Sequence, residues 1–132
     1  MTETLEDLIE NFSFFDDWEE RYRYLIDLGR NLPKMDDNLK TEQNLVRGCT
    51  SQVWLDAKTD NNMLEFTADS DAHIVRGLIG ILHAAYNGKT FQDIAKTDIE
   101  GAMGKIGLDQ NLSPNRRNGF YAMVERIRAL SA

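Results

Sequence analysis

The spacing of apolar residues changes twice along this chain, and this change limits the fold more than any other feature of the sequence. Residues 53–57 and 63–68 each alternate apolar and polar side chains, which is the period of a half-buried strand. The segment TDNN between them, residues 59–62, is rich in residues that favour tight turns. The pattern predicts an antiparallel hairpin, and Asn44–Arg47 is a candidate third strand.

On both sides of this hairpin the apolar residues follow the helical period. Helices are predicted at residues 3–12, from Asp16 to Pro33, from Ser70 or Asp71 to Asn87-Gly88, at 91–96, at 99–106 and from Ser113-Pro114 to near the end. Helices, then a small antiparallel sheet, then helices indicate a two-layer α+β domain. A length of 132 residues suits one domain, so we expect residues 1–132 to form a single unit.

The charge balance argues against some partners. Asp and Glu number 22 against 15 Lys and Arg, which gives a formal net charge of -7. This charge repels a phosphate backbone and an anionic membrane surface, so we expect neither nucleic acid nor membrane as a partner. No apolar run approaches the roughly 20 residues of a membrane span. The acidic start MTETLEDLIENF is unlike a signal peptide, so we expect a cytoplasmic protein.

Cys49 is the only cysteine, so it cannot form a disulfide within the chain. It is either a buried structural residue, as many free cysteines are, or a reactive thiol. Gly48 permits a tight turn, and Cys49 precedes the alternating strand instead of lying on its apolar face. Thr50 and Ser51 offer hydroxyl groups that could bind nearby backbone or a sulfur anion. These features favour the reactive thiol.

Charged residues at two predicted helix starts allow both a structural and a functional explanation. Arg116 and Arg117 lie in the first turn of the last helix, where positive charge opposes the helix dipole. They are either a solvated pair or the site at which an anion is met, on a partner surface or on Cys49. Asp69 and Asp71 lie where acidic residues stabilise a helix N-terminus, and capping accounts for them.

The histidines and glycines do not form a recognisable site. His73 and His83 are ten residues apart on one predicted helix, which is not the i, i+4 spacing of a metal-binding pair. A single cysteine cannot complete a zinc cluster, so we expect no metal site. The chain contains no phosphate-binding glycine motif. A Cys–His hydrolase would require one of these histidines next to Cys49, and this alternative stays open.

Three segments together resemble one protein family. They are NLVRGCTSQVWL (44–55), ADSDAHIVRGLIGIL (68–82) and LDQNLSPNRRNGFYAMVERIRAL (108–130). In order and spacing they are similar to the cysteine motif, the segment after the hairpin and the C-terminal helix of the SufE family. The resemblance implies an α+β, two-layer SufE/NifU-like domain with a three-stranded antiparallel sheet packed on helices.

The resemblance also implies a function. Cys49 would take a sulfane sulfur from the persulfide of a PLP-dependent cysteine desulfurase of the SufS or CsdA type, and the protein would stimulate that enzyme. The sulfur would then pass to an iron–sulfur scaffold complex of the SufBCD type. The protein would need no cofactor and would be a covalent carrier rather than a stand-alone enzyme. A homodimer stays open, as does the choice between the Suf and Csd pathways.

The family carries an aspartate and an arginine at the positions of Asp71 and Arg116, and both are associated with its cysteine loop or partner contact. These two residues therefore join Cys49, Gly48 and Ser51 as candidate site residues. We expect Cys49 to lie on a mobile loop that hinges at Gly48 and rests against apolar side chains.

Two positions depart from the family pattern. Thr50 replaces a common glutamine, which affects hydrogen bonding in the loop, and Arg117 is less typical at its position. The main alternative is a binding module that regulates a desulfurase without carrying sulfur. A NifU-like cluster scaffold is disfavoured because one cysteine cannot supply the usual cluster ligands.

Overall fold

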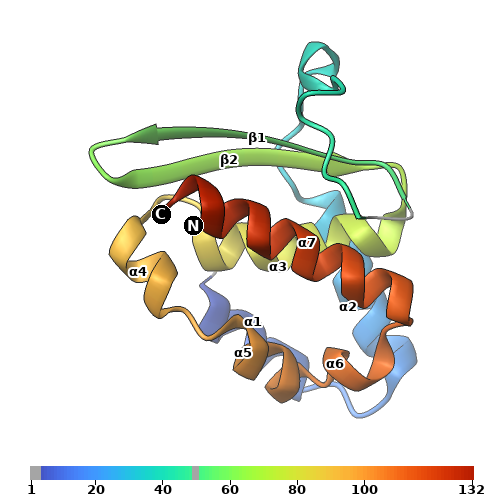
Figure 1. Ribbon diagram of the computed structural model, residues 1–132. Helices are drawn as coiled ribbons and strands as arrows, with labels where there is room; N and C mark the ends of the chain where they lie inside the picture. Colours follow the sequence, from blue (N-terminus) through green and yellow to red (C-terminus); the bar gives the residue numbers. More distant parts are fainter. Residues whose placement is uncertain (1–3, 49–50) are drawn as a thin grey trace.

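The computed structural model describes residues 4–48 and 51–132, which contain seven α-helices, one 3-10 helix and a three-stranded antiparallel sheet (Figure 1). In chain order the elements are α1 (Leu5–Ser13), α2 (Trp18–Arg30), η1 (Asp37–Leu39), β1 (Val53–Asp60), β2 (Met63–Ser70), α3 (His73–Tyr86), β3 (Lys89–Thr90), α4 (Phe91–Lys96), α5 (Ile99–Ile106), α6 (Leu108–Asn111) and α7 (Pro114–Leu130). The predicted α+β class with a three-stranded sheet is confirmed. None of the helices in the described ranges is long and apolar enough to cross a membrane.

The predicted hairpin is formed by β1 and β2, which pair antiparallel from Val53 opposite Ser70 to Asp60 opposite Met63. Asn61 and Asn62 make the two-residue turn, with φ values of 52° and 63°. Two consecutive positive φ values are the geometry of a type I′ turn, which matches the right-handed twist of paired strands. Asparagine tolerates this region better than most residues, so the TDNN segment determines where the chain reverses.

The third strand is β3, which pairs with Met63 and Leu64 of β2. The prediction of a third strand at Asn44–Arg47 was therefore wrong. That segment makes only one isolated bridge to the sheet, between Leu45 and Trp54 at the free edge of β1. Pairing ends there because the chain turns away at Gly48, whose φ is 93°.

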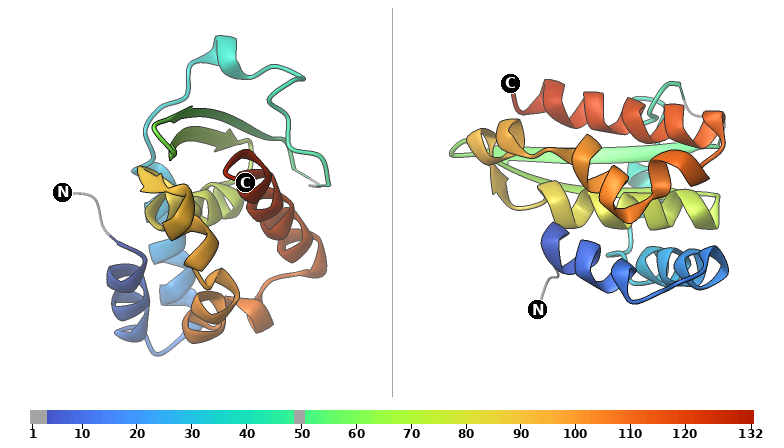
Figure 2. Two further views of the ribbon diagram at one scale, coloured as in Figure 1. Left: turned by 60° about the vertical axis from the view of Figure 1, so that its left-hand side comes forward. Right: turned by 90° about the horizontal axis from the view of Figure 1, so that it is seen from below.

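Two helices, α3 and α7, lie side by side under the hairpin, and α1, α2 and α5 form a second helical layer further from the sheet (Figures 1 and 2). The hairpin contributes Leu55, Leu64 and Phe66 to the core, each at most 4% exposed. Helix α2 packs closely on α3 at Gly77, where an added Cβ would lie 2.2 Å from the Leu25 carbonyl oxygen. Only glycine permits this approach of the two helices.

The predicted helices at 91–96 and 99–106 have the bounds of α4 and α5, and the last helix begins as predicted. Ser113 caps α7, since its Oγ accepts the Arg116 backbone N–H at 3.3 Å, and Pro114 occupies the first turn. The α2 cap is Asp17 rather than Asp16. The Asp17 carboxylate accepts the Glu20 backbone N–H at 2.8 Å.

The start of α3 also differs from the prediction, which placed the cap at Ser70 or Asp71. The N-cap residue is Ala72, and no side chain caps the helix. Strand β2 continues to Ser70, and the Asp71 backbone N–H donates to the Gln52 carbonyl oxygen at 3.4 Å. Asp71, the residue after β2, therefore still pairs with Gln52, the residue before β1, and α3 can begin only after Asp71.

Candidate functional site

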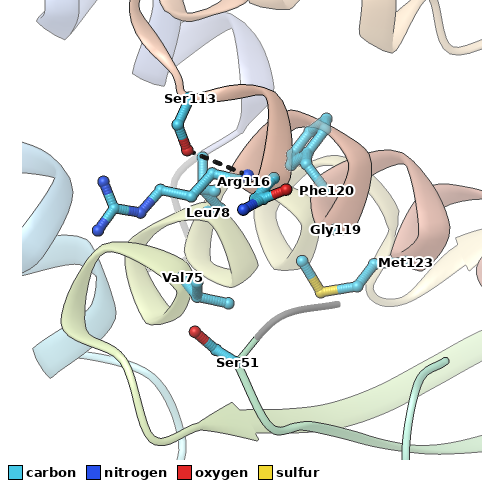
Figure 3. Close-up of a pocket in the computed structure, with 9 residues that line it drawn as sticks. Ser51, Val75, Leu78, Ser113, Arg116, Gly119, Phe120 and Met123 are labelled. Atoms are coloured by element: carbon cyan, nitrogen blue, oxygen red, sulfur yellow. Dashed lines mark hydrogen bonds between the residues drawn. The ribbon is translucent and has the colours of Figure 1, made fainter. Parts of the chain in front are cut away.

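A cavity of about 320 Å³ lies between α3 and α7, next to the chain that leads into β1 (Figure 3). Its lining residues are Ser51, Val75, Leu78, Ser113, Asn115, Arg116, Gly119, Phe120 and Met123. The inner wall is apolar and comes from the two helices, whereas the serine, asparagine and arginine side chains form a polar rim. This is the mixed lining typical of a small binding pocket.

Helical spacing produces the apolar wall. Val75 and Leu78 are three residues apart on α3, and Phe120 and Met123 are three residues apart on α7, so each pair shares one helix face. Leu78 is 0% exposed, and Phe120 and Met123 are each 1% exposed. The stripes that sequence periodicity assigns to the core therefore also form the wall of the cavity.

Cys49 and Thr50 lie outside the described residues, and the prediction of a mobile loop at rest against apolar side chains falls on them. The residues on either side are described. Gly48 is exposed, and a Cβ added to it would lie 3.5 Å from the Ala122 Cβ of α7. Ser51 lines the cavity. The structure thus brings two predicted site residues, Gly48 and Ser51, to α7 and to the cavity respectively.

Arg116, the third predicted site residue, lies on the rim of the same cavity. Its side chain is exposed and makes no ion pair or hydrogen bond with another described residue. In Figure 3 its guanidinium extends outward, away from Ser51. Arg117 differs, because it donates a hydrogen bond to the backbone carbonyl of Asp109 and so ties α7 to α6. Of the two arginines, Arg116 is the one whose guanidinium has no partner among the described residues.

The fourth predicted residue, Asp71, contacts the chain beside the cavity through its backbone and not through its side chain. Its N–H binds the Gln52 carbonyl oxygen, which fixes the chain just after Ser51. Its carboxylate is exposed and has no partner among the described residues. Arg47 points elsewhere, since it is exposed and pairs with Glu42 at 3.4 Å. Asp71 and Arg116, whose charged groups have no partner in residues 4–48 and 51–132, therefore lie near the entry to β1.

Neither histidine lines the cavity. His73 is exposed at the first residue of α3, and His83 packs edge-on against the ring of Phe66 with centroids 5.3 Å apart. His83 is eight residues beyond Val75, which is about 12 Å along the helix. Burial lowers the pKa of His83, opposed by a hydrogen bond to the Phe66 backbone. This arrangement gives the Cys–His hydrolase no support. Within the described ranges no three His, Cys, Asp or Glu side chains form a group that could hold a metal ion.

Sequence reasoning missed one residue that acts on this region. Arg126 of α7 donates from Nη1 to the Leu45 carbonyl oxygen and from Nη2 to the Gln43 carbonyl oxygen, each at 3.1 Å. These acceptors lie more than 80 positions away in the sequence. Nothing in the local pattern of α7 distinguishes Arg126 from an exposed helical arginine.

Residues 6–131 match the SufE family, which is described as an Fe-S metabolism associated domain. The chain belongs to the SufE family. SufE-like proteins of Rhizobium etli and Rhizobium meliloti are 49% and 45% identical to it. The matches cover 95% and 96% of this chain and 87% and 93% of those proteins. The family places this protein in iron–sulfur metabolism.

The fold has a relative among solved structures as well. The solution structure of a hypothetical protein from Thermus thermophilus superposes with a TM-score of 0.77. The match covers 96% of this chain and 92% of that one, at 19% sequence identity. It supports the α+β architecture of the SufE-family chain.

Proposed function

We propose that this SufE-family protein is a sulfur acceptor and carrier for iron–sulfur cluster assembly, with Cys49 as the acceptor. The observation that carries the proposal is that the family match, residues 6–131, includes the single cysteine of the chain. The donor is a PLP-dependent cysteine desulfurase in the cytoplasm, of the SufS or CsdA type, which the protein also stimulates. The recipient is a scaffold complex of the SufBCD type.

The transfer step is an exchange between a thiolate and a persulfide. Cys49 loses its proton, and its thiolate attacks the outer sulfur of the persulfide on the desulfurase cysteine. The sulfur–sulfur bond of that persulfide breaks, the desulfurase cysteine leaves as a thiolate, and Cys49 becomes the persulfide. The sulfane sulfur moves with no net oxidation or reduction. A second thiol nearby would attack the new persulfide and form a disulfide, and this chain has no second cysteine.

The cavity supports a carrier role because a bound sulfane sulfur needs shelter from reductants between donor and recipient. Its apolar wall offers a water-poor environment, and Ser51 on its rim is two residues from Cys49 in the sequence. Its rim offers hydroxyl and amide donors for a sulfur anion. In this proposal Arg116 and Asp71 contact the desulfurase, since their charged groups have no internal partners among the described residues.

The alternative is a regulator that binds the desulfurase without carrying sulfur. The Cys49→Ser variant distinguishes the two. Desulfurase turnover is measured with free cysteine and limiting reductant, with wild-type protein and with the variant. A carrier loses its stimulation in the variant, whereas a regulator stimulates equally. The Kd for the desulfurase, measured by calorimetry, serves as the control, because serine is nearly isosteric and we expect the Kd to be unchanged.

A further inference from the structure

We infer that Arg126 is a positioning residue that fixes the chain leading to Cys49. The effect of Arg126 on sulfur transfer rests on the proposed function, whereas its effect on the chain rests on the described contacts. Arg126 lies on α7, three residues beyond Met123 of the cavity wall, and does not itself line the cavity. Any effect on sulfur transfer therefore acts through the segment that it binds.

The contact is a two-point clamp. The Nη1 and Nη2 groups of Arg126 donate to two backbone carbonyls, those of Leu45 and Gln43. A guanidinium presents its donors in a rigid planar fork, so two bonds at once define the position of the bound segment more closely than one bond does. Hydrogen bonds from a charged donor are also about twice as strong as neutral ones.

The clamped segment is also anchored in the core by Val46, which is 4% exposed. It bonds to the sheet through the Val46 N–H, which donates to the Val53 carbonyl oxygen at 2.8 Å, and through the Asn44 carbonyl oxygen, which accepts the Leu55 N–H at 2.9 Å. These bonds hold it to the edge strand only. Arg126 adds the connection to α7.

A second contact continues this connection toward Cys49. Ala122 lies four residues before Arg126, on the same face of α7, and Gly48 rests close to it. The chain is thus bonded to one helix face at positions 43 and 45 and lies close to it at position 48. On the far side of Cys49, the bond from the Asp71 N–H holds Gln52. Arg126 therefore defines the upstream end of the span that carries the thiol.

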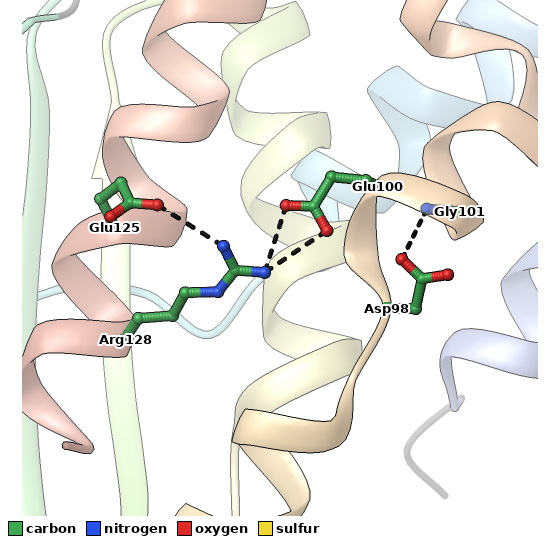
Figure 4. Close-up of polar contacts among 5 residues, drawn as sticks. All are labelled: Asp98, Glu100, Gly101, Glu125 and Arg128. Carbon is green, nitrogen blue, oxygen red and sulfur yellow. Dashed lines mark hydrogen bonds and ion pairs between the residues drawn. The ribbon is translucent and has the colours of Figure 1, made fainter.

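Arg128 provides a matched control. It lies on the same helix and is also partly exposed, but it pairs with Glu100 at 3.2 Å and Glu125 at 3.5 Å (Figure 4). Figure 4 shows this group between α5 and α7. The guanidinium hydrogen bonds of Arg128 to described residues go to Glu100 and Glu125, and none goes to residues 43–48. Replacing Arg128 removes the same charge from the same helix and leaves the clamp intact.

The first test is amide hydrogen exchange of the peptide covering residues 43–48. In Arg126→Met, which keeps an unbranched apolar stem but has no donors, we expect exchange about tenfold faster than in the wild type. Arg126→Lys, with a single donor group, gives an intermediate rate. Arg128→Met leaves the peptide unchanged. An unchanged exchange rate in Arg126→Met overturns the clamp.

The second test is the rate at which iodoacetamide alkylates the protein, which reports on Cys49 alone because the chain has one thiol. The same variants are then given sulfur by a desulfurase. We expect Arg126→Met to change the alkylation rate and to reduce sulfur uptake severalfold, with partial rescue in Arg126→Lys and none of these effects in Arg128→Met. Faster exchange with unchanged alkylation and uptake overturns the positioning role.

The two proposals fail separately. If the wild-type protein takes no sulfur from any desulfurase, the proposed function fails, and exchange and alkylation still decide whether Arg126 positions the thiol. If the wild-type protein takes sulfur and Arg126→Met takes it equally fast, only the inference about Arg126 fails.

Discussion

Replacing Gly48 by alanine introduces backbone strain next to the thiol, and a matched glycine elsewhere shows what the same strain does far from the thiol. Gly48 has a φ of 93°, in the region that L residues rarely adopt. The side chain itself has room, because the new Cβ would lie at an ordinary contact distance of 3.5 Å from the Ala122 Cβ. The cost is therefore conformational, about 1–2 kcal/mol if the backbone keeps its angle. For a domain of this size, 1 kcal/mol corresponds to a shift in Tm of about 4 °C.

The chain offers a matched control in Gly88, which has a φ of 72° and no atom within 4 Å of an added Cβ. Gly88 lies between α3 and β3, and its N–H donates to the Leu64 carbonyl oxygen, a bond that alanine keeps. Gly88→Ala therefore introduces the same kind of strain without a steric clash. We expect both variants to lose about 1–2 kcal/mol in the free energy of unfolding.

The two variants should differ in chemistry. Gly48→Ala either keeps a strained backbone or relaxes toward negative φ and redirects the chain at the next residue, Cys49. Because relaxation relieves the strain, we expect the redirected chain and slower sulfur uptake from a desulfurase, whereas Gly88→Ala should take up sulfur at the wild-type rate. Urea denaturation gives the free energy, and intact-protein mass spectrometry over time gives the uptake. Equal uptake by Gly48→Ala and Gly88→Ala would show that the backbone angle at Gly48 does not affect sulfur transfer.

Two further predictions concern the framework that holds the site. Gly77→Ala should lower the free energy of unfolding by at least about 2 kcal/mol. Its Cβ would lie 2.2 Å from the Leu25 carbonyl oxygen, so α2 would have to move away from α3. A loss under about 0.5 kcal/mol by urea denaturation would contradict this. Burial holds the pKa of His83 below its usual 6.5, so the unfolded chain binds that proton more readily and stability falls as the pH drops below about 6.5. His83→Gln should flatten this part of the stability profile, and a pKa above 6.5 by NMR titration would show that the sign is wrong.

Local patterns predicted the elements that local interactions determine. The hairpin, α4, α5 and the start of α7 follow from alternation, helical period and a serine–proline start. The third strand could not be predicted, because β3 is only two residues long and is defined by its pairing with β2. The predicted cap of α3 was wrong for a similar reason, since the bond between Asp71 and Gln52 extends the hairpin by one residue.

The candidate site also contains residues that the sequence predicts and features that depend on distant contacts. Gly48, Ser51 and Arg116 were identified from the sequence and from the family motif, and the structure describes all three beside α7 or the cavity. The sequence could not show that two core stripes leave a cavity between them, because that depends on how α3 and α7 pack. Nor could it identify Arg126, whose acceptors are backbone carbonyls more than 80 residues away.

The most direct test of the central claim is to locate the transferred sulfur. The protein is incubated with a purified cysteine desulfurase and free cysteine, without reductant, and then analysed by intact mass and by peptide mapping. We predict a gain of one or more sulfur atoms on the peptide that contains Cys49, reversed by reductant and absent in Cys49→Ser. A thiol that stays free to alkylation and gains no sulfur, with desulfurases of both the SufS and CsdA types, would contradict the account.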